Sequence, residues 1–460
     1  MQGVLSLFTT YLPYFILVLS LLVFVHEYGH YWVGRRFGIH AEVFSIGFGP
    51  ELFGWTDRNG TRWRISVVPL GGYVKFLGDA DATSALPSDA PLPPEDRRRA
   101  FFSQPLHARA AVVVGGPAAN LLFAFLLLTG VFFFAGEPYS PSIVAVAADG
   151  PAARAGLRSG DEIVRLGDKK INRFEDIQES EFLYLAKKPM PVEFRRGSDI
   201  LRAEIVPQYC QRTDRYNNTI RTGELGLDQL IRPVVGAFAA NSPAEIAGLK
   251  VGDVLLQIDG EPVGDFSRIR DLIGGHPGQA VSVKYERAGQ QYDTTIVPQS
   301  DVVVDCAGKE VTVGRLRIRP AAVTEIRSHG LFGAMGAGVH QIWTMTTMIY
   351  TSMGQIVTAA RPVDDLGGPI RIAKAAGDAS HAGWAGILNL VIVLSVGLGL
   401  FNLLPVPMLD GGQLAMYAIE AVRGKPLSLR VQEYGLRVGF ALVICLVLFV
   451  SFNDIRLLLR

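Results

Sequence analysis

The chain has 460 residues, of which 49% are hydrophobic and 19% are charged, and its formal net charge at pH 7 is +1. This composition is too apolar for an ordinary soluble enzyme, so membrane-spanning segments are expected, and the length allows several domains. The near-neutral charge, without a patch of Lys and Arg, excludes nucleic-acid binding through a basic surface, because such binding depends on many cationic contacts with phosphates.

Four apolar segments are predicted to cross a bilayer as helices. Three of them lack Asp, Glu, Lys and Arg over more than the roughly 20 residues that a spanning helix needs. The fourth is shorter but can begin earlier if Arg437 extends toward the headgroups. The segments are 1–25, 110–136, 382–409 and 438–453. The first has no basic residues at its start and no clear cleavage site, so we expect a retained helix rather than a signal peptide.

The distribution of Lys and Arg predicts the orientation of these spans. None precedes residue 25, whereas ten lie between the first two spans. The positive-inside rule therefore places that loop in the cytoplasm, and four spans leave both termini and segment 137–327 outside. Segment 328–360 also lacks charges, but it is rich in Gly, Ser and Thr, and a fifth span would move Asp410 to the wrong side. We expect one or two helices there, lying on the membrane surface or against the helical core.

Segment 137–327 contains an internal repeat. The sequence of residues 152–171 returns at 243–263 with Ala-Gly-Leu and Gly-Asp in the same register. Each copy is predicted to form short β-strands around a small helix. The copies resemble circularly permuted PDZ domains, which bind extended peptides by strand addition. The resemblance implies that the peptide-binding strands are Leu225, Gly226 and Leu227 in the first copy and, with a weaker match, 313–316 in the second; it implies peptide or protein C-termini as partners.

Two of the three cysteines lie in this outer segment. Cys210 and Cys306 follow the two modules in comparable loops, on the side of the membrane where disulfides can form. Their spacing leaves open whether they form a disulfide or remain free thiols. Cys445 lies in the fourth span.

The end of the first span carries the motif His-Glu-Tyr-Gly-His. His26 and His30 are four residues apart and therefore share one helix face, as two imidazole ligands of one zinc ion require. Glu27 is placed to act as a general base, since a carboxylate beside a zinc site can accept the proton of the attacking water. The alternative is a chance match in which these side chains are merely packed or solvated. Ionisable groups within a membrane span are costly and favour the functional interpretation.

The third ligand is expected at the end of the third span. Asp410 is the only acidic residue between 382 and 419, and it follows two prolines and precedes the pair Gly411 and Gly412. These residues should break the helix and allow Asp410 to turn inward, with Asn402 as a hydrogen-bonding residue for substrate. In the alternative interpretation this is an ordinary helix terminus whose carboxylate faces water.

Segment 44–76 is predicted to form β-hairpins, because it alternates apolar and polar residues and has glycines at the turns. Such strands cannot face lipid unpaired. They either pack only on the protein's own helices at the cytoplasmic side or dip toward the zinc site. The glycines concerned include Gly47, Gly49, Gly71 and Gly72.

These motifs together resemble the site-2 protease family. The resemblance rests on the His-Glu-Tyr-Gly-His motif, on the paired modules and on four further stretches: 69–76, 115–120, 368–374 and 402–412. It implies a polytopic α-helical membrane protein with four transmembrane helices, a re-entrant β-hairpin element and two extracytoplasmic, circularly permuted PDZ (α+β) domains. It also implies Zn²⁺ held by His26, His30 and Asp410, with Glu27 as the catalytic base.

The same resemblance implies a substrate and a location. The substrate would be a single-pass transmembrane protein, such as an anti-sigma factor already cut outside, and Asn402 together with Gly47, Gly49, Gly71 and Gly72 would position it. The expected place is the bilayer of a bacterial inner membrane, in a stress response. The rival hypotheses are a catalytically silent membrane scaffold that binds partners through its PDZ modules, and a metal transporter.

The expected organisation follows the motifs along the chain. It comprises a first transmembrane helix with the zinc motif (1–37), a cytoplasmic-side and re-entrant β-element (38–107), a second helix (108–136), two PDZ domains (137–231 and 232–320), surface or bracing helices (321–380), a third helix ending at the Leu-Asp-Gly motif (381–409) and a fourth helix (434–455).

Overall fold

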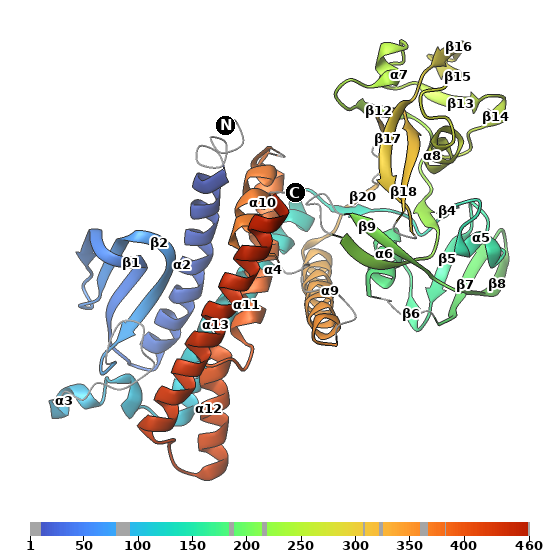
Figure 1. The fold of residues 1–460 in the computed structure, drawn as a ribbon. Helices are drawn as coiled ribbons and strands as arrows, with labels where there is room; N and C mark the ends of the chain where they lie inside the picture. Colours follow the sequence, from blue (N-terminus) through green and yellow to red (C-terminus); the bar gives the residue numbers. More distant parts are fainter. Residues whose placement is uncertain are drawn as a thin grey trace. The chain divides into compact units, whose positions relative to one another are not determined.

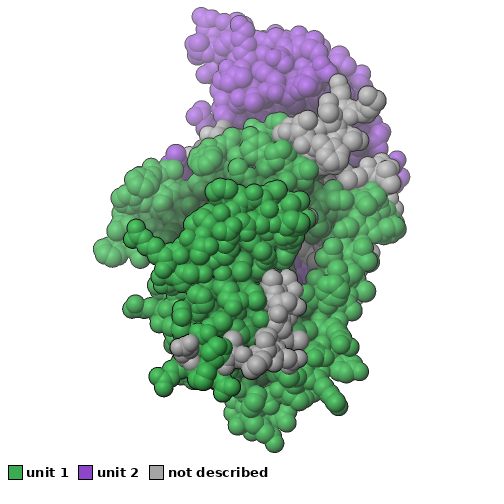
Figure 2. Space-filling view, turned by 90° about the vertical axis from the view of Figure 1, so that its left-hand side faces the viewer, with its two compact units in different colours: residues 1–136, 328–350, 366–460 green, residues 137–327, 351–365 purple. Residues whose placement is uncertain are grey.

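A computed structural model describes residues 11–79, 93–183, 188–213, 219–306, 309–321, 325–358, 367–381 and 383–458. The chain divides into two compact units, which Figure 2 distinguishes by colour. Unit 1 contains Met1–Gly136, Ser328–Tyr350 and Leu366–Arg460, and unit 2 contains Glu137–Arg327 and Thr351–Asp365.

Among the described residues, four helices are long and apolar enough to cross a membrane, and all belong to unit 1. They are α2 (Leu12–Arg36), α4 (Leu106–Phe134), α11 (Gly383–Asn402) and α13 (Leu429–Leu458). They correspond to the four predicted spans. The third is shorter than expected, since its helix ends at Asn402 rather than at residue 409, and the fourth is longer at both ends.

Small residues let α2, α4 and α11 approach closely. A Cβ at Gly29 of α2 would collide with the main-chain carbonyl of Gly115 in α4, so only glycine fits at this crossing. On the other side of α4, the Ser395 hydroxyl of α11 donates to the Asn120 carbonyl at 2.8 Å. Helix α4 is therefore the central element of the helical core, and Ala124 and Leu128 are buried in it.

The strands β1 (Ala41–Thr56) and β2 (Arg62–Phe76) are long and bent, and their pairing produces four antiparallel segments. Residues 43–46 pair with 62–65 on one side and with 72–75 on the other, while 51–56 pair with 62–66. Segment 72–76 is thus an edge of the sheet. Figure 1 shows the sheet lying along α2, and buried aromatic residues of both elements share one core.

Besides the four spans, unit 1 contains helices α10 (Pro369–His381) and α12 (Asp410–Arg423), the part of α9 (Leu331–Val357) up to Tyr350, and the short helices α3 (Pro94–Arg97) and η2 (Phe101–Ser103). The rest of α9, from Thr351, belongs to unit 2. Helix α9 covers most of the uncharged segment, whose residues 359–360 lie outside the described chain. It is not among the four candidate spans, and its Gly338 packs against Thr129 of α4. Helix α10 packs on the start of α2 through Gly377 and Tyr11. Helix α12, which the sequence did not predict, begins at the aspartate expected to bind metal.

Unit 2 contains two modules with the same sheet topology. Each has a four-stranded sheet in which the strands, numbered along the chain, lie in the order second, first, third, fourth. The first comprises β6 (Lys169–Lys170), β5 (Glu162–Leu166), β7 (Met190–Arg196) and β8 (Asp199–Ile205), with α5 (Pro151–Arg154) and α6 (Phe174–Leu183). The second comprises β14 (Glu261–Pro262), β13 (Val254–Ile258), β15 (Val281–Arg287) and β16 (Gln290–Ile296), with α7 (Pro243–Ile246) and α8 (Phe266–Gly274).

Additional strand pairs frame the modules. The pairs are β4 (Val144–Val146) with β11 (Leu227–Gln229), β12 (Val235–Phe238) with β19 (Ile318–Pro320), β9 (Gln208–Thr213) with β10 (Thr219–Glu224), and β17 (Gln299–Val304) with β18 (Glu310–Arg315). Cys210 of β9 forms a disulfide with Cys306, so these two cysteines are not free thiols.

One prediction about the second module was wrong by about three residues. Residues 313–315 lie in β18, whereas the strand that occupies the place of β11 is β19, preceded by Leu316 and Arg317. Gly226 and Arg317 correspond: their carbonyls accept from Ala147 and Ala239, and both have positive φ, +74° and +54°. Glycine usually fills such a position, so an arginine there concealed the match.

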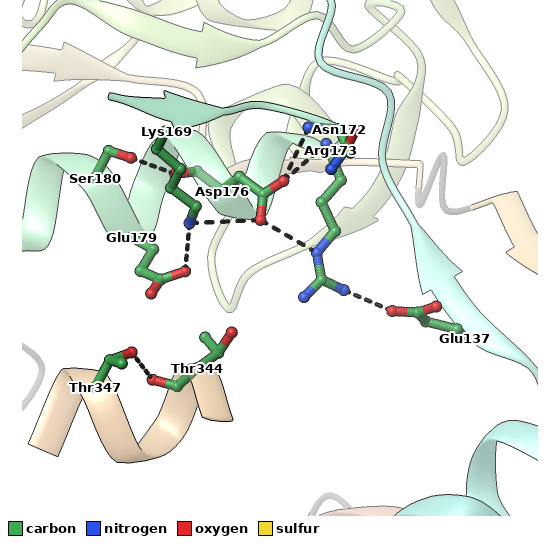
Figure 3. A network of polar contacts seen from close by, with 9 residues as sticks. All are labelled: Glu137, Lys169, Asn172, Arg173, Asp176, Glu179, Ser180, Thr344 and Thr347. Carbon is green, nitrogen blue, oxygen red and sulfur yellow. Dashed lines mark hydrogen bonds and ion pairs between the residues drawn. The ribbon is translucent and has the colours of Figure 1, made fainter. Parts of the chain in front are cut away.

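The first and last strands of segment 137–327 pair with each other. β3 (Glu137–Tyr139) pairs with β20 (Glu325–Arg327). Arg173 donates to Glu137 at 2.6 Å, and Asp176 accepts from the main-chain N–H groups of Asn172 and Arg173 at 2.9 and 3.2 Å (Figure 3). These bonds tie the start of unit 2 to the first turn of α6.

Candidate metal centre and active site

His26 and His30 face each other across one turn of α2. Their Nε2 atoms are 3.2 Å apart. The Nδ1 atom of His30 lies 2.8 Å from the carbonyl oxygen of Val112 in α4, so its N–H donates to that oxygen. This hydrogen bond leaves the Nε2 lone pair of His30 directed at the space between the two rings.

Asp410 reaches the same space from the other end of the chain. Its Oδ2 lies 3.2 Å from Nε2 of His26 and 3.5 Å from Nε2 of His30. The chain breaks after α11 as the prolines predicted, and Met408 takes a positive φ of +88° before α12 begins. Gly411 and Gly412 are required there, because a Cβ at either would collide with main-chain carbonyls of residues 403–406.

The three ligand atoms fit a zinc ion. Zinc bonds of about 2.0–2.2 Å in a tetrahedron place neighbouring ligand atoms about 3.3–3.6 Å apart, and the observed separations are 3.2, 3.2 and 3.5 Å. In addition, Oδ2 of Asp410 is buried and has no hydrogen-bond partner among the described residues. A buried, unpartnered carboxylate oxygen is costly unless a cation satisfies it. Three protein ligands leave a fourth position for water or substrate, as in catalytic sites.

Glu27 lies between this cluster and the edge of the β-sheet. Its Cγ would be 3.2 Å from a Cβ at Gly72, and the main chain of Val74 lies within hydrogen-bonding reach of its carboxylate. A Cβ at Gly116 of α4 would collide with the His30 ring, so glycines keep both the metal side and the sheet side of the site open. The candidate base, the candidate metal ligands and the edge segment 72–76 therefore meet at one place.

The structure separates the residues that were expected to position substrate. Gly47, Gly49 and Gly71 have φ angles of +88°, +88° and +125° and form the bends of β1 and β2. Of the four glycines, Gly72 is the one that lies against Glu27.

Asn402 is the last residue of α11, and within the described chain its side chain makes no hydrogen bond to the cluster. Leu225, Gly226 and Leu227 belong to unit 2, where Leu225 and Leu227 are buried in the first module.

One buried side chain at the site had no role in the prediction. Asn120 of α4 is 0% exposed, and its Nδ2 lies 3.2 Å from Nδ1 of His26. The available signal was a single amide within the second span, just after two glycines, a proline and two alanines. Composition cannot tell whether such an amide faces a metal ligand or another helix.

Comparisons with known proteins agree over nearly the whole chain. The family description "Peptidase family M50" matches residues 14–446. A Rhizobium meliloti protein assigned by name to the zinc metalloproteases is 36% identical, covering 97% of this chain and 96% of its own length. The regulator of sigma-E protease RseP of Escherichia coli is 32% identical, covering 96% of this chain and 97% of its own. A solved PDZ domain from Listeria monocytogenes matches 19% of this chain and 84% of its own at 20% identity, with a TM-score of 0.15, which is too low to establish a shared fold.

Proposed function

Because this chain belongs to peptidase family M50, the site-2 protease family, and is a zinc metalloprotease, we propose that it cuts single-pass membrane proteins within their transmembrane segments. The observation that carries the proposal is the cluster of His26, His30 and Asp410, with Glu27 beside it, in a unit built from four membrane-length helices. Family membership confirms the resemblance found in the sequence and disfavours both the silent scaffold and the transporter.

We assign the zinc to Nε2 of His26, Nε2 of His30 and Oδ2 of Asp410. The assignment is supported by the three interatomic distances and by the unpartnered carboxylate oxygen. When bound, zinc supplies Lewis-acid activation of water and of the peptide carbonyl.

Glu27 carries the proton transfers of the reaction. Its carboxylate accepts a proton from the water that attacks the scissile carbonyl carbon, and a new C–O bond forms. The protonated side chain then delivers that proton to the leaving nitrogen as the C–N bond breaks. One water is consumed, and a carboxyl and an amine terminus result.

The sheet edge gives the substrate a place to unwind. A helical peptide keeps its carbonyls hydrogen-bonded, which protects them from attack. Among the described residues, segment 72–76 pairs with another strand on one side only, and it adjoins Glu27, so an extended segment of substrate can add to its other side as a further strand. Gly72 keeps this edge close to the base because it has no side chain.

The proposed setting follows the charge distribution. The zinc site lies toward the cytoplasmic side of a bacterial inner membrane, both termini and unit 2 lie outside, and the two modules are PDZ domains that limit access and can bind peptide C-termini. The substrate would be an anti-sigma-factor-like protein that another protease has already shortened. The RseP relatives are named as regulators of sigma-E, which supports this substrate class.

The test pairs zinc content with cleavage in one preparation. Glu27→Gln removes the carboxylate but leaves all three metal ligands in place. Zinc should remain near one per chain, and cleavage of a model transmembrane peptide in detergent should fall by about 10²–10⁴.

Glu433→Gln is the matched control, because Glu433 is a half-exposed residue of α13 that pairs with Arg437. It should change neither quantity. Undiminished cleavage by Glu27→Gln with full zinc content would remove Glu27 from the reaction and contradict the mechanism.

A further inference from the structure

A buried amide lies behind His26, on the side away from the proposed metal. The Nδ2 atom of Asn120 is 3.2 Å from Nδ1 of His26, while Oδ1 of Asn120 is buried and has no hydrogen-bond partner in the part of the chain that the structure describes. The main chain of Asn120 is fixed by the Ser395 hydroxyl at 2.8 Å. The amide group can therefore rotate about its own bond while its position stays constant.

Hydrogen-bond chemistry decides which end of the amide should face His26 when metal is bound. A neutral histidine that binds zinc through Nε2 carries its proton on Nδ1, so Nδ1 becomes a donor. An amide NH₂ group is also a donor, and two donors cannot bond to each other. A half-turn of the amide presents Oδ1 to Nδ1–H and gives both buried groups a partner.

We propose that Asn120 is a positioning residue of the metal centre, whose Oδ1 accepts from Nδ1–H of His26 and thereby holds the Nε2 lone pair on zinc. This inference rests on the proposed zinc site. The ring of His30 is oriented in the same way by a main-chain carbonyl, that of Val112, which accepts from its Nδ1–H. Of the two histidine ligands, His26 is thus the one whose orientation depends on a side chain.

The test measures zinc affinity of the full chain in detergent by competition with a chelator. Asn120→Leu keeps the volume but removes the acceptor, and zinc should bind about 10–100-fold more weakly. Asn120→Asp restores an acceptor at the same place and should bind zinc at least as tightly as the original chain. Thr129→Val is the control, since it removes another buried polar group from α4.

Unchanged affinity in Asn120→Leu, or an equal loss in Asn120→Asp, would overturn the inference. If the leucine variant does not fold, the aspartate variant decides alone, and weaker zinc binding by it counts against the role. Cleavage is recorded separately. A chain that binds zinc with the predicted pattern but cuts no peptide would refute the proposed function and leave the role of Asn120 standing.

A different observation, in unit 2, concerns the loop before β11. The main-chain N–H of Leu225 donates to Oε1 of Glu181 at 3.0 Å, and Glu181 lies in the last turn of α6. Gly226, the next residue, has a φ of +74°. In domains that bind a peptide C-terminus, main-chain N–H groups of a loop like this one donate to the terminal carboxylate of the peptide. Here a side-chain carboxylate of the same chain already occupies one of them.

In the second module an apolar residue takes the place of Glu181. Helices α6 and α8 align at Phe174 with Phe266 and at Ile177 with Ile269, which places Ile273 at the position of Glu181. Ile273 is apolar and buried. It lines a groove of about 790 Å³ between α8 and the strands of residues 313–319.

We infer that the first module is capped by its own chain: Glu181 competes with peptide C-termini for the Leu225 loop, whereas the groove of the second module is open. Removing the carboxylate should make the first module available. Hydrogen bonds to charged groups are strong enough that the affinity of the first module for a peptide C-terminus should rise about 10-fold or more.

The probe is a pool of fluorescein-labelled nonapeptides that end in Val, Leu or Ala, tested on the full chain in detergent. Glu181→Ala should bind one more peptide per chain than the original protein, and the gain should vanish with amidated peptides. Exchange of the Leu225 amide hydrogen should accelerate in the same variant. Glu204→Ala removes an exposed carboxylate of β8 and should change neither.

Unchanged stoichiometry together with unchanged amide exchange would overturn the capping role, as would an equal gain with amidated peptides. Should Glu181→Ala fail to fold, Glu181→Lys replaces it. That variant also removes the competing carboxylate. If it binds no more peptide than the original protein, the inference is contradicted in the same way.

Discussion

Asp253 and Asp161 of unit 2 are satisfied differently from Asp410 of unit 1. In unit 2, Asp253 accepts two bonds from the Arg287 guanidinium, both at 2.7 Å, and one from the main-chain N–H of Lys250, also at 2.7 Å. Asp161 repeats this arrangement with Arg196 and the N–H of Arg158. In unit 1, Oδ2 of Asp410 is buried, and no described residue forms a hydrogen bond with it.

We expect such a difference between a structural carboxylate and a metal ligand. A buried carboxylate with a full set of donors stabilises the fold, whereas one without donors is tolerated because something outside the chain completes it. The agreement between the two modules, down to the Gly156 and Gly248 carbonyls that accept from the same arginines at 2.9 Å, indicates that the outer arrangement is a repeated structural device.

Asp410→Asn should have the largest effect on function. The change removes the negative ligand, so zinc content and cleavage should both fall below detection. Because an unsatisfied charge is also removed, the metal-free variant should melt no lower than the metal-free original chain. Melting in detergent after chelation measures this, and a clearly lower melting temperature would show that Asp410 has a structural role as well.

Asp253→Asn should have the opposite profile. A neutral amide cannot accept all three bonds, so unit 2 should lose about 1–3 kcal/mol, the cost of leaving a buried hydrogen-bonding group unmatched. Zinc content should stay constant. Amide exchange in β13 reports the loss, and Asp293→Asn, at an exposed position of β16, is the control. Loss of zinc in Asp253→Asn would contradict the separation of roles.

Acid should act on unit 2 through Asp161. Burial alone would raise the pKa of Asp161, but hydrogen bonds from Arg196 and from the Arg158 N–H bring it below its ordinary value. Its contribution to stability is therefore complete above about pH 4, the unfolded value, and is lost as the pH falls through the lower folded value. Asp161→Asn should flatten the acid limb of the unfolding curve of unit 2, and an unchanged limb would refute this assignment.

The sequence predicted most where local geometry decides the outcome. Helical pitch places His26 opposite His30, and Pro405, Pro407 and the glycine pair break the chain at Asp410. The four-segment pairing of β1 and β2 was missed, because the bends at Gly47, Gly49 and Gly71 reverse the partners within one strand. The register of the second module was missed because Arg317, rather than a glycine, takes the positive φ.

Deleting residues 143–319 should have the smallest effect on the chemistry. The proposed zinc ligands, the proposed base and the strand edge all belong to unit 1, and the deletion keeps β3 and β20, which pair with each other. Cleavage of a substrate with a short outer domain should stay within about threefold of the original rate, or rise if the modules limit access; a change of this size corresponds to less than 1 kcal/mol in the barrier. Cleavage of a substrate with a long, folded outer domain should rise more, because the modules would no longer hold it back. Both substrates are compared in one detergent preparation, with zinc content as the check on folding. Loss of all cleavage from a zinc-loaded deletion variant would show that unit 2 takes part in the reaction itself, and the contrast between a catalytic unit and a recognition unit would then be wrong.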